Sequence, residues 1–460
     1  MSGISRRAVL GIAVTGSVSA LFAGCAPGPA RGPEGGPDPG PVAPSPTAPR
    51  GGYGPLVRDP EGLLDLPEGF RYTVLSREGE QLRSGEGRVP GRFDGMAAFA
   101  SSDGRLALVR NHENKPDSPT TVPRVEGLVY DPGAKGGCTV LGLDANRSVQ
   151  SERVALAGTA VNCAGGPTPW GTWLTCEESE GRAGDDGYER DHGFVFEVDP
   201  FDMAANREPR PITAMGRFRH EAVAVDPRTG IVYQTEDASG PFGLIYRYLP
   251  DRPLRGRGSL LAGGRLEALR VPDVADLSEV TEPGTVLEGV QWVPVPDPLA
   301  EGTPTRMQDH AERITRAQKL EGAYWGNGGA YVVSSYARSG EGAAASHHGQ
   351  VWRYDPAANA LVLEIRFGSD AELELPGESP DNIAISPYGG LMVCEDGAGG
   401  QHVYGVDRAG EVYPFARNRQ EVDDGYGEFA GVTFSPDGST LFVNVYTPGT
   451  TFAITGPWTG

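Results

Sequence analysis

The sequence has few cysteines, few aromatic residues and little positive charge. Its 460 residues include 5 cysteines, 8% aromatic side chains, and 40 lysines and arginines against 61 aspartates and glutamates. The resulting net charge of −21 argues against nucleic acid as a partner, because its recognition depends on Lys and Arg meeting phosphates. The surplus carboxylates serve either an acidic, soluble surface or the binding of metal ions, and composition alone leaves both open.

Long hydrophobic runs are also missing beyond the first 25 residues, so no later stretch could span a membrane. Hydrophobic residues make up 38% of the chain, below the usual globular share, whereas glycine (67) and proline (40) are abundant. This composition favours many short strands joined by tight turns over long helices. We expect a single large domain over residues 53–460, although the length also allows two or three ordinary domains.

The first 25 residues predict an export signal. Arg6 and Arg7 precede an apolar stretch from Ala8 to Ala23, which is too short and too rich in glycine for a membrane-spanning helix. Paired arginines before such a stretch are typical of twin-arginine export; a general secretory signal with a chance arginine pair is the alternative. The motif Phe-Ala-Gly-Cys ending at Cys25 resembles a lipobox. Lipid on Cys25 would attach the exported protein to a membrane surface, through a disordered Pro- and Gly-rich tether over residues 26–52.

The remaining four cysteines differ in their surroundings. They would suffice for two disulfides in an exported protein. Cys176 and Cys394 each precede an acidic residue at a strand end and are typical of buried strand residues. Cys163 lies in a turn of small residues after Asn162, where a thiolate would be a soft metal ligand or a nucleophile. A G-x-S-x-G motif is absent, so nothing indicates a serine nucleophile.

One unit recurs six times along the chain. In each copy a polar residue precedes a short alternating strand, a turn usually containing glycine follows, and a second strand ends in a polar or aromatic residue. The copies cover residues 93–113, 162–178, 220–237, 320–336, 380–396 and 428–446. Six such hairpins, separated by further strands, predict an all-β protein, a six-bladed β-propeller decorated by insertions. The longest insertion lies near residues 251–312 and predicts a short helix around 306–320; an irregular β-sandwich array is the alternative.

In a propeller the first strand of each blade lines the central channel, so the polar ends of these strands converge. The strand starts supply Asp94, Asn162, Glu221, Glu321, Asp381 and Glu428. The returns supply Glu113, Glu177, Glu178, Glu236, Asp237, Glu395 and Asp396. So many carboxylates in a confined channel need cations to neutralise them. Oxygen ligands suit Ca²⁺, and one thiolate suits a softer transition ion.

Several of these segments resemble the PhoX family of alkaline phosphatases. The resemblance is carried by NCAGGPTPWGTWLTCEE (162–178), GRFRHEAVAVDPRTGIVYQTEDA (216–238), SPDNIAISPYGGLMVCEDG (379–397) and FSPDGSTLFVNV (434–445), and it spans residues 60 to 450. It implies a twin-arginine-exported six-bladed propeller that acts on phosphomonoesters. It also implies a site with ferric ions (Fe³⁺), calcium ions (Ca²⁺) and a bridging oxo group.

The resemblance implies roles for particular residues. Cys163 would be the thiolate ligand to iron, and further metal ligands would be Glu221, Glu321, Asp381, Glu113, Glu178, Glu236 and Glu395. Two positions depart from the family pattern. Lys319 stands where an arginine would grip phosphate and offers a point charge without a bidentate fork, and Tyr446 replaces a glutamine. His220 would be a general acid or a residue behind the metal ligands, with a structural histidine as the alternative.

Two other functions stay open at the level of the sequence. A calcium-dependent propeller lactonase would need fewer ligands and no thiolate. A lipid-anchored scaffold would use channel metals only to brace the fold. The phosphatase interpretation predicts a monomer at the cell surface, in the periplasm or outside the cell, with a small phosphate ester as its substrate.

Overall fold

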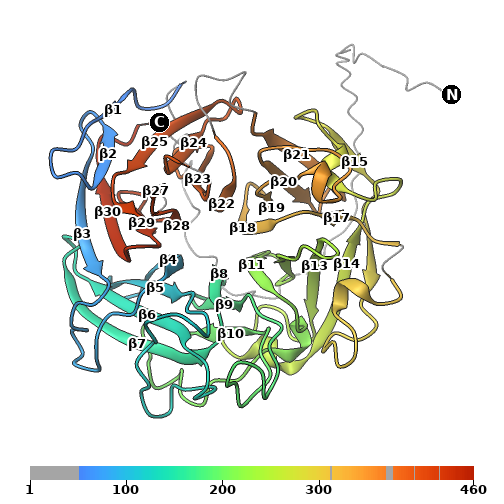
Figure 1. Ribbon diagram of the computed structural model, residues 1–460, viewed down its shortest axis with the longest axis horizontal. Coiled ribbons are helices and arrows are strands. Elements are labelled where there is room, and N and C mark those ends of the chain that lie inside the picture. The colour runs from blue at the N-terminus through green and yellow to red at the C-terminus, as the bar shows by residue number, and fades with distance from the viewer. Residues whose placement is uncertain (1–50, 311–312, 369–376, 398, 424, 460) are drawn as a thin grey trace, which may run out of the picture. The chain divides into compact units, whose positions relative to one another are not determined.

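Six antiparallel β-sheets surround a common axis, and the inner strand of each sheet faces the centre (Figure 1). The computed structural model describes residues 51–310, 313–368, 377–397, 399–423 and 425–459. The inner strands follow one another around the ring in chain order, and the last lies beside the first. The predicted six-bladed β-propeller is confirmed. The described residues fall in one unit, Ser45–Gly460, whereas the predicted signal (1–25) and nearly all of the predicted tether lie outside them.

The first three blades are built in chain order from the inside outward. Blade 1 comprises β4 (Phe93–Ala100), β5 (Leu106–His112), β6 (Gly136–Leu143) and β7 (Val149–Thr159). Blade 2 comprises β8 (Asn162–Pro167), β9 (Trp173–Glu177) and β10 (Val195–Val198). Blade 3 comprises β11 (His220–Val225), β12 (Val232–Glu236), β13 (Gly243–Pro250), β14 (Gly264–Arg270) and β16 (Gln291–Pro294), and β17 (Arg316–Ala317) pairs with β13.

The other three blades recruit strands from elsewhere in the chain. Blade 4 comprises β18 (Leu320–Gly326), β19 (Gly329–Ser334), β20 (Gln350–Asp355), β21 (Ala360–Arg366) and β15 (Val286–Glu288). Blade 5 comprises β22 (Pro380–Ile385), β23 (Leu391–Glu395), β24 (His402–Val406), β25 (Val412–Asn418), β2 (Leu64–Pro67) and β1 (Leu56–Val57). Blade 6 comprises β28 (Phe429–Phe434), β29 (Leu441–Val445), β30 (Thr450–Thr455) and β3 (Arg71–Arg77). A small hairpin, β26 (Glu421–Val422) and β27 (Gly425–Tyr426), lies between blades 5 and 6 in the chain.

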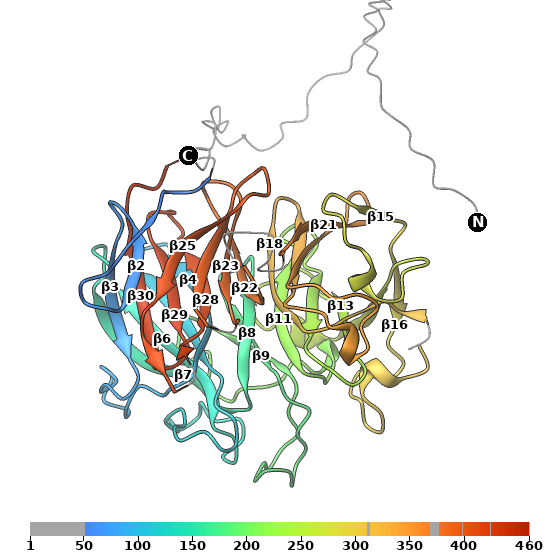
Figure 2. The ribbon, with the colours of Figure 1, turned by 45° about the horizontal axis from the view of Figure 1, so that its top comes forward.

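The N-terminal part of the fold closes the ring. Strand β3 pairs antiparallel with β30, so blade 6 contains residues from both ends of the described chain (Figure 2). Strand β2 likewise pairs with β25 and extends blade 5 outward. These pairings occupy the edges of β25 and β30, which would otherwise present unpaired backbone groups.

The recurrent sequence unit coincides with the two innermost strands of every blade. The six pairs are β4–β5, β8–β9, β11–β12, β18–β19, β22–β23 and β28–β29. Turn chemistry fixes several of these hairpins. Between β11 and β12, for example, the Asp226 carboxylate accepts hydrogen bonds from the Arg228 N–H and the Thr229 hydroxyl, each at 2.9 Å. Such Asx turns set the register of the strands that they join.

The core is divided into apolar layers between neighbouring blades. Trp352 and Tyr233 belong to the layer between blades 3 and 4, and Phe415 and Phe429 belong to the layer between blades 5 and 6. The four cysteines after Cys25 are all buried and none forms a disulfide. As predicted, Cys176 and Cys394 pack in interblade layers.

The long insertion contains short elements rather than the predicted helix. Among its described residues, around 306–320, the chain forms the 3-10 turn η4 (Thr305–Met307) and the strand β17. The insertion also places β15 at the outer edge of the next blade, where it pairs with β21. Other 3-10 turns within the described residues are η1 (Thr213–Met215), η2 (Ser259–Ala262), η3 (Leu277–Glu279) and η6 (Ser339–Glu341).

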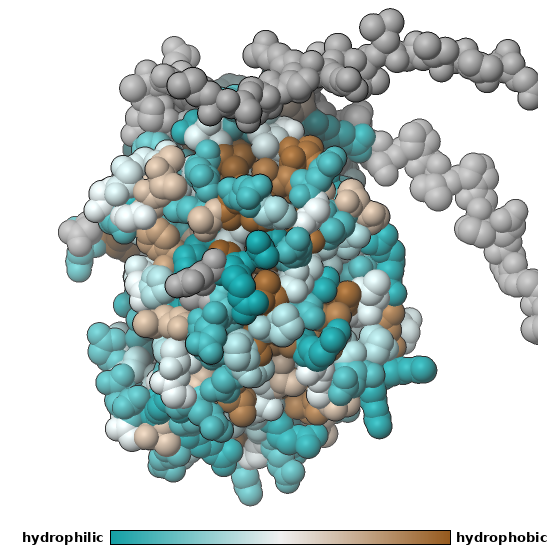
Figure 3. Space-filling model, turned by 90° about the vertical axis from the view of Figure 1, so that its right-hand side faces the viewer, coloured by the Kyte–Doolittle hydropathy of each residue, from teal (hydrophilic) through white to brown (hydrophobic). Residues whose placement is uncertain are grey.

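The surface on the side of the long insertion carries both apolar and hydrophilic residues. In Figure 3, apolar residues form small groups separated by hydrophilic ones. Among the described residues, no helix is long and apolar enough to cross a membrane.

Candidate functional site

A polar cavity of about 450 Å³ lies at one end of the channel, and all the blades contribute to it. We call it the channel mouth, and its lining residues are Arg92, Asp94, Glu113, Lys115, Asp117, Ser118, Cys163, Glu178, Arg219, Glu221, Asp237, Lys319, Glu321, Asp381, Asp396, Glu428 and Tyr446. Ten of these side chains are carboxylic acids and only four are cationic. An excess of six acids in one confined space predicts that additional cations belong there.

The second residue of the inner strand supplies the deepest acids. In blades 1 to 5 this residue is Asp94, Cys163, Glu221, Glu321 and Asp381, and all five line the channel mouth. In blade 6 the equivalent residue is Ala430, and Glu428, two residues earlier, provides the carboxylate instead. The first strand residue turns the other way, into the blade. For that reason Asn162, expected at the mouth, instead bonds to Thr159 and Thr175.

Backbone irregularity turns these side chains toward the axis. Every inner strand carries a register shift within its first residues, the kind of β-bulge that re-aims side chains near active sites. Small residues come next along the inner strands, because neighbouring inner strands nearly touch at that level. A Cβ on Gly95 would lie 2.6 Å from the Ala164 Cα, and one on Gly322 would lie 2.6 Å from the Asp381 carbonyl oxygen. Behind the mouth the channel narrows to a cavity of about 30 Å³ lined largely by such residues.

In every blade except blade 4, where Ser335 lies outside the lining, the residue directly after the return strand forms the second tier of the channel mouth. Its N–H donates to the carbonyl of the residue before the inner strand, for example Glu113 to Arg92 at 3.0 Å and Asp237 to Arg219 at 3.2 Å. The six residues at this position are Glu113, Glu178, Asp237, Ser335, Asp396 and Tyr446. Because side chains alternate along a strand, the residue before each of these points into the protein instead.

This alternation separates the predicted ligands. Glu236 and Glu395 are the last residues of their strands and do not line the channel mouth; their neighbours Asp237 and Asp396 do. Glu236 accepts from Arg306 at 2.9 Å and from the Tyr246 hydroxyl at 2.8 Å. Glu395 accepts from the His402 ring at 2.9 Å.

Glu177, the neighbour of Glu178, is held in a buried network of its own. Its carboxylate lies 2.7 Å from the His192 Nδ1 and accepts from the Gly193 N–H at 2.9 Å. The other ring nitrogen of His192 lies 3.0 Å from Asp131. The two carboxylates raise the pKa of His192 despite its burial. This network anchors the end of β9, immediately before Glu178.

His220 also lies outside the lining of the channel mouth. Its ring stacks on Phe218 at 3.6 Å between centroids, and its Nε2 lies 3.2 Å from the Gly216 carbonyl oxygen. Burial lowers the pKa of His220 to about 3, so at physiological pH the ring is neutral rather than the charged imidazolium that would serve as a general acid.

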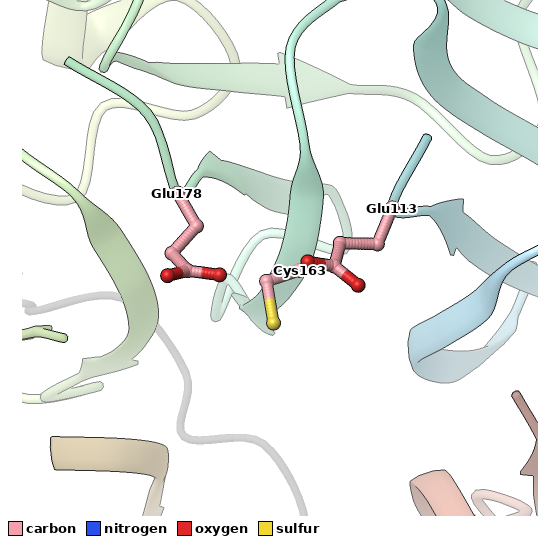
Figure 4. A group of neighbouring side chains, drawn as sticks. All are labelled: Glu113, Cys163 and Glu178. Carbon is pink, nitrogen blue, oxygen red and sulfur yellow. The ribbon is translucent and has the colours of Figure 1, made fainter. Parts of the chain in front are cut away.

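Two groups of side chains in the channel mouth can each hold a metal ion. Glu113, Cys163 and Glu178 present ligand atoms within 4.8 Å of one another, and so do Glu221, Glu321 and Asp381. In Figure 4, Cys163 projects from its strand between the carboxylates of Glu113 and Glu178. The Cys163 sulfur also lies 3.2 Å from the Glu221 Oε1, so the two groups adjoin. A thiolate with several carboxylates combines a soft ligand with hard ones.

The electrostatics of the channel mouth fit a cation. Burial, together with neighbouring acids, raises the pKa values of Asp94, Glu221 and Glu428. Burial and Asp396 raise the pKa of Asp381 to about 7. Burial, Asp94 and Glu221 raise the pKa of the Cys163 thiol. The buried Glu221 Oε2 has no hydrogen-bond partner among the described residues. A bound metal ion would keep these groups ionised and satisfy that oxygen.

Three of the four cations at the mouth are paired with these acids. Lys319 lies 2.9 Å from Asp237 and also pairs with Glu321. Lys115 lies 3.1 Å from Glu113, and Arg219 pairs with Glu178. The hydroxyl of Tyr446 donates to Glu113, and that carboxylate together with burial raises the phenol pKa.

Seven of the predicted site residues therefore meet in the channel mouth: Cys163, Glu221, Glu321, Asp381, Glu113, Glu178 and Lys319. Sequence reasoning selected neither Arg92, Lys115 nor Arg219. A usable signal existed for Arg92 and Arg219, because both precede an inner strand, as Lys319 does. Lys115 lies in an irregular loop, where no repeat position identifies it.

Comparison with known proteins identifies a family. The family model described as alkaline phosphatase PhoX matches residues 51–153 and 142–449. No curated protein matches the chain. Among solved structures, Pseudomonas fluorescens PhoX in complex with vanadate, a transition-state analogue, is 19% identical, with a TM-score of 0.61 over 86% of this chain and 96% of that one.

Two other solved structures are less similar. A gluconolactonase from Xanthomonas campestris is 14% identical with a TM-score of 0.43, covering 88% of this chain and 98% of its own. The PQQ domain of pyranose dehydrogenase from Coprinopsis cinerea is also 14% identical with a TM-score of 0.43, covering 86% of this chain and 98% of its own.

Proposed function

Because the chain belongs to the alkaline phosphatase PhoX family and is therefore a hydrolase of phosphoester bonds, we propose that its channel mouth hydrolyses phosphomonoesters with the help of bound metal ions. One observation carries the proposal: ten acids and Cys163 converge in a cavity of about 450 Å³ with only four cations beside them. A phosphate dianion could not enter so acidic a cavity unless metal ions reversed its charge.

We assign ferric iron to Cys163 together with Glu221, Glu321 and Asp381, and calcium to the oxygen ligands around Glu113 and Glu178. The contact between Cys163 and Glu221 supports the first assignment, and the preference of Ca²⁺ for carboxylate oxygens supports the second. Asp94, Asp237, Asp396 and Glu428 lie in the same cavity and complete the ligand supply. When bound, such ions supply Lewis acidity toward the phosphoryl oxygens and toward water.

The protein's own groups orient the reactants. Lys319 holds the carboxylates of Asp237 and Glu321 in place through its ion pairs. Tyr446 keeps its proton and fixes the Glu113 carboxylate by donating to it. The cavity behind the mouth measures only about 30 Å³, so we infer that the phosphate group enters from the mouth itself.

A substrate panel tests this function. The purified protein, loaded with iron and calcium, is expected to hydrolyse p-nitrophenyl phosphate with turnover that rises toward alkaline pH, and to be inhibited by vanadate. Bis(p-nitrophenyl) phosphate and a small lactone should react far more slowly. Lactone hydrolysis with calcium alone would favour a lactonase instead, and full metal content without any turnover would favour a scaffold.

The alternation of side chains yields a second test. Asp396→Asn is expected to weaken metal binding by about 10- to 100-fold, the size of effect seen when groups around a metal are altered, because Asp396 lines the channel mouth. Glu395→Gln, the matched control on the adjacent residue, should leave metal content unchanged and lower only the melting temperature, because Glu395 bonds to His402. Metal analysis and thermal unfolding of both variants test which of the two acids binds metal. The reverse pattern would contradict this assignment.

We also propose twin-arginine export and lipidation at Cys25, supported by Arg6, Arg7 and the Phe-Ala-Gly-Cys motif. Mass spectrometry of the exported N-terminal peptide checks the lipidation: an unmodified peptide that begins elsewhere would rule out the lipid.

A further inference from the structure

Arg92 is the one cation of the channel mouth that forms no ion pair with a carboxylate of the described residues. Lys115, Arg219 and Lys319 each pair with at least one acid. Arg92 lines the same cavity and is only partly buried. Its charge is therefore not neutralised by a neighbouring acid, even though the cavity has acids in excess.

The contacts of Arg92 explain this isolation. Its guanidinium carbon lies 5.1 Å from the centre of the Tyr446 ring, and one terminal nitrogen donates to the Thr447 hydroxyl at 3.2 Å. The Tyr446 hydroxyl in turn donates to Glu113. The tyrosine thus occupies the carboxylate that would otherwise attract the arginine, and its ring holds the guanidinium by a cation–π contact.

The backbone also fixes where Arg92 stands. The residue has a left-handed conformation with φ of 57°, which costs a non-glycine residue free energy and persists only where the surroundings impose it. Its carbonyl accepts the Glu113 N–H at 3.0 Å. Arg92 precedes β4 and Tyr446 follows β29, so the pair spans the seam between blades 1 and 6, beside the group formed by Glu113, Cys163 and Glu178.

We propose that Arg92 binds the non-bridging oxygens of the substrate's phosphoryl group, an inference that rests on the proposed phosphatase function. A guanidinium has five N–H donors, and the Thr447 hydroxyl takes one of them. The planar fork suits two oxygens of a phosphate at once. Lys319, in contrast, is already bound to two acids and offers only a point charge. Arg92 therefore supplies the bidentate contact that Lys319 does not.

Inhibition by inorganic phosphate and by vanadate tests the proposal. Arg92→Met is expected to raise both inhibition constants, and KM for p-nitrophenyl phosphate, by roughly 10- to 100-fold, the range for losing a charge-assisted hydrogen bond. Arg92→Lys should give a smaller increase, because it keeps the charge but not the fork. Metal content should not change, because the Arg92 side chain forms no ion pair with a metal-ligand carboxylate among the described residues. The matched control is Arg105→Met, an exposed arginine at the other end of β5, paired with Asp103, which should behave like wild type.

The outcomes are separable. Inhibition constants within twofold of wild type in an active, metal-loaded Arg92→Met protein would overturn the role of Arg92 and leave the proposed function standing. A wild-type protein with full metal content that neither turns over p-nitrophenyl phosphate nor binds phosphate would overturn both. If the Arg92→Met protein loses metal or unfolds, the inhibition constants of the Arg92→Lys and Thr447→Val proteins test the role of Arg92 instead. Unchanged inhibition constants in both, with full metal content, would overturn the proposal, and raised constants would support it.

Discussion

Replacing Cys163 by alanine is expected to remove bound transition metal and to lower phosphatase turnover by at least about a hundredfold. Altering groups that merely support metal ligands already costs about 10- to 100-fold, and Cys163 supplies the one sulfur among the described residues that line the channel mouth. Its sulfur also stands 3.2 Å from Glu221, so its loss affects both groups of ligands. Metal analysis and p-nitrophenyl phosphate turnover on the same preparation provide the measurement.

Cys176→Ala is the matched control. Cys176 is buried in the same hairpin but packs among apolar side chains between blades 2 and 3. Its truncation should lower stability by about 1 kcal/mol and leave metal content and turnover intact. Full iron content and full turnover in the Cys163→Ala protein would be incompatible with the proposed metal site.

The metal-free protein is expected to lose stability as pH rises from about 4 to 7, whereas the metal-loaded protein should not. Burial and neighbouring acids raise the pKa values of Asp94, Glu221, Glu321 and Glu428, and raise that of Asp381 to about 7 from 3.8. An acid whose pKa is higher in the folded state binds its proton more tightly there. Its stabilising contribution is therefore complete below the unfolded pKa and is lost as pH rises through the folded pKa. For Asp381 alone the loss would be up to about 4 kcal/mol.

Thermal unfolding at pH 5 and pH 8, with and without a chelator, measures this effect. Metal ions bind ionised ligands, so the stability that they confer should grow with pH, the opposite trend. The variant Asp381→Asn removes one titrating group and should flatten the profile of the metal-free protein. A metal-free protein that is more stable at pH 8 than at pH 5 would show that these acids are not the dominant titrating groups.

Whether a candidate ligand reaches the channel mouth depends on its exact position in the hairpin, and the repeat pattern indicated this position only in part. The six hairpins were visible in the sequence because strand alternation and turns are local properties. The sequence analysis selected Glu178, not Glu177, as a metal ligand. The same position in the other return strands is Asp237 rather than Glu236, and Asp396 rather than Glu395. Aligning the ends of the return strands would have revealed this. Blade 6 departs from the regular pattern, because its inner strand carries Ala430 where the others carry an acid or a thiol, yet Glu428, which the sequence analysis selected, still lines the channel mouth.

The sequence by itself determined the β-propeller, its number of blades, the family, and the convergence of carboxylates on the channel, because these follow from short-range periodicity and from motifs. Only the tertiary structure decided which residues of the inner strands face the axis, Cys163 rather than Asn162 for example, because bulges within their first residues rotate side chains in ways that alternation alone does not encode. It also decided that Glu236 bonds to Arg306 and that Tyr446 separates Arg92 from Glu113. These contacts join residues 70 to more than 300 positions apart, and nothing local in the sequence brings them together.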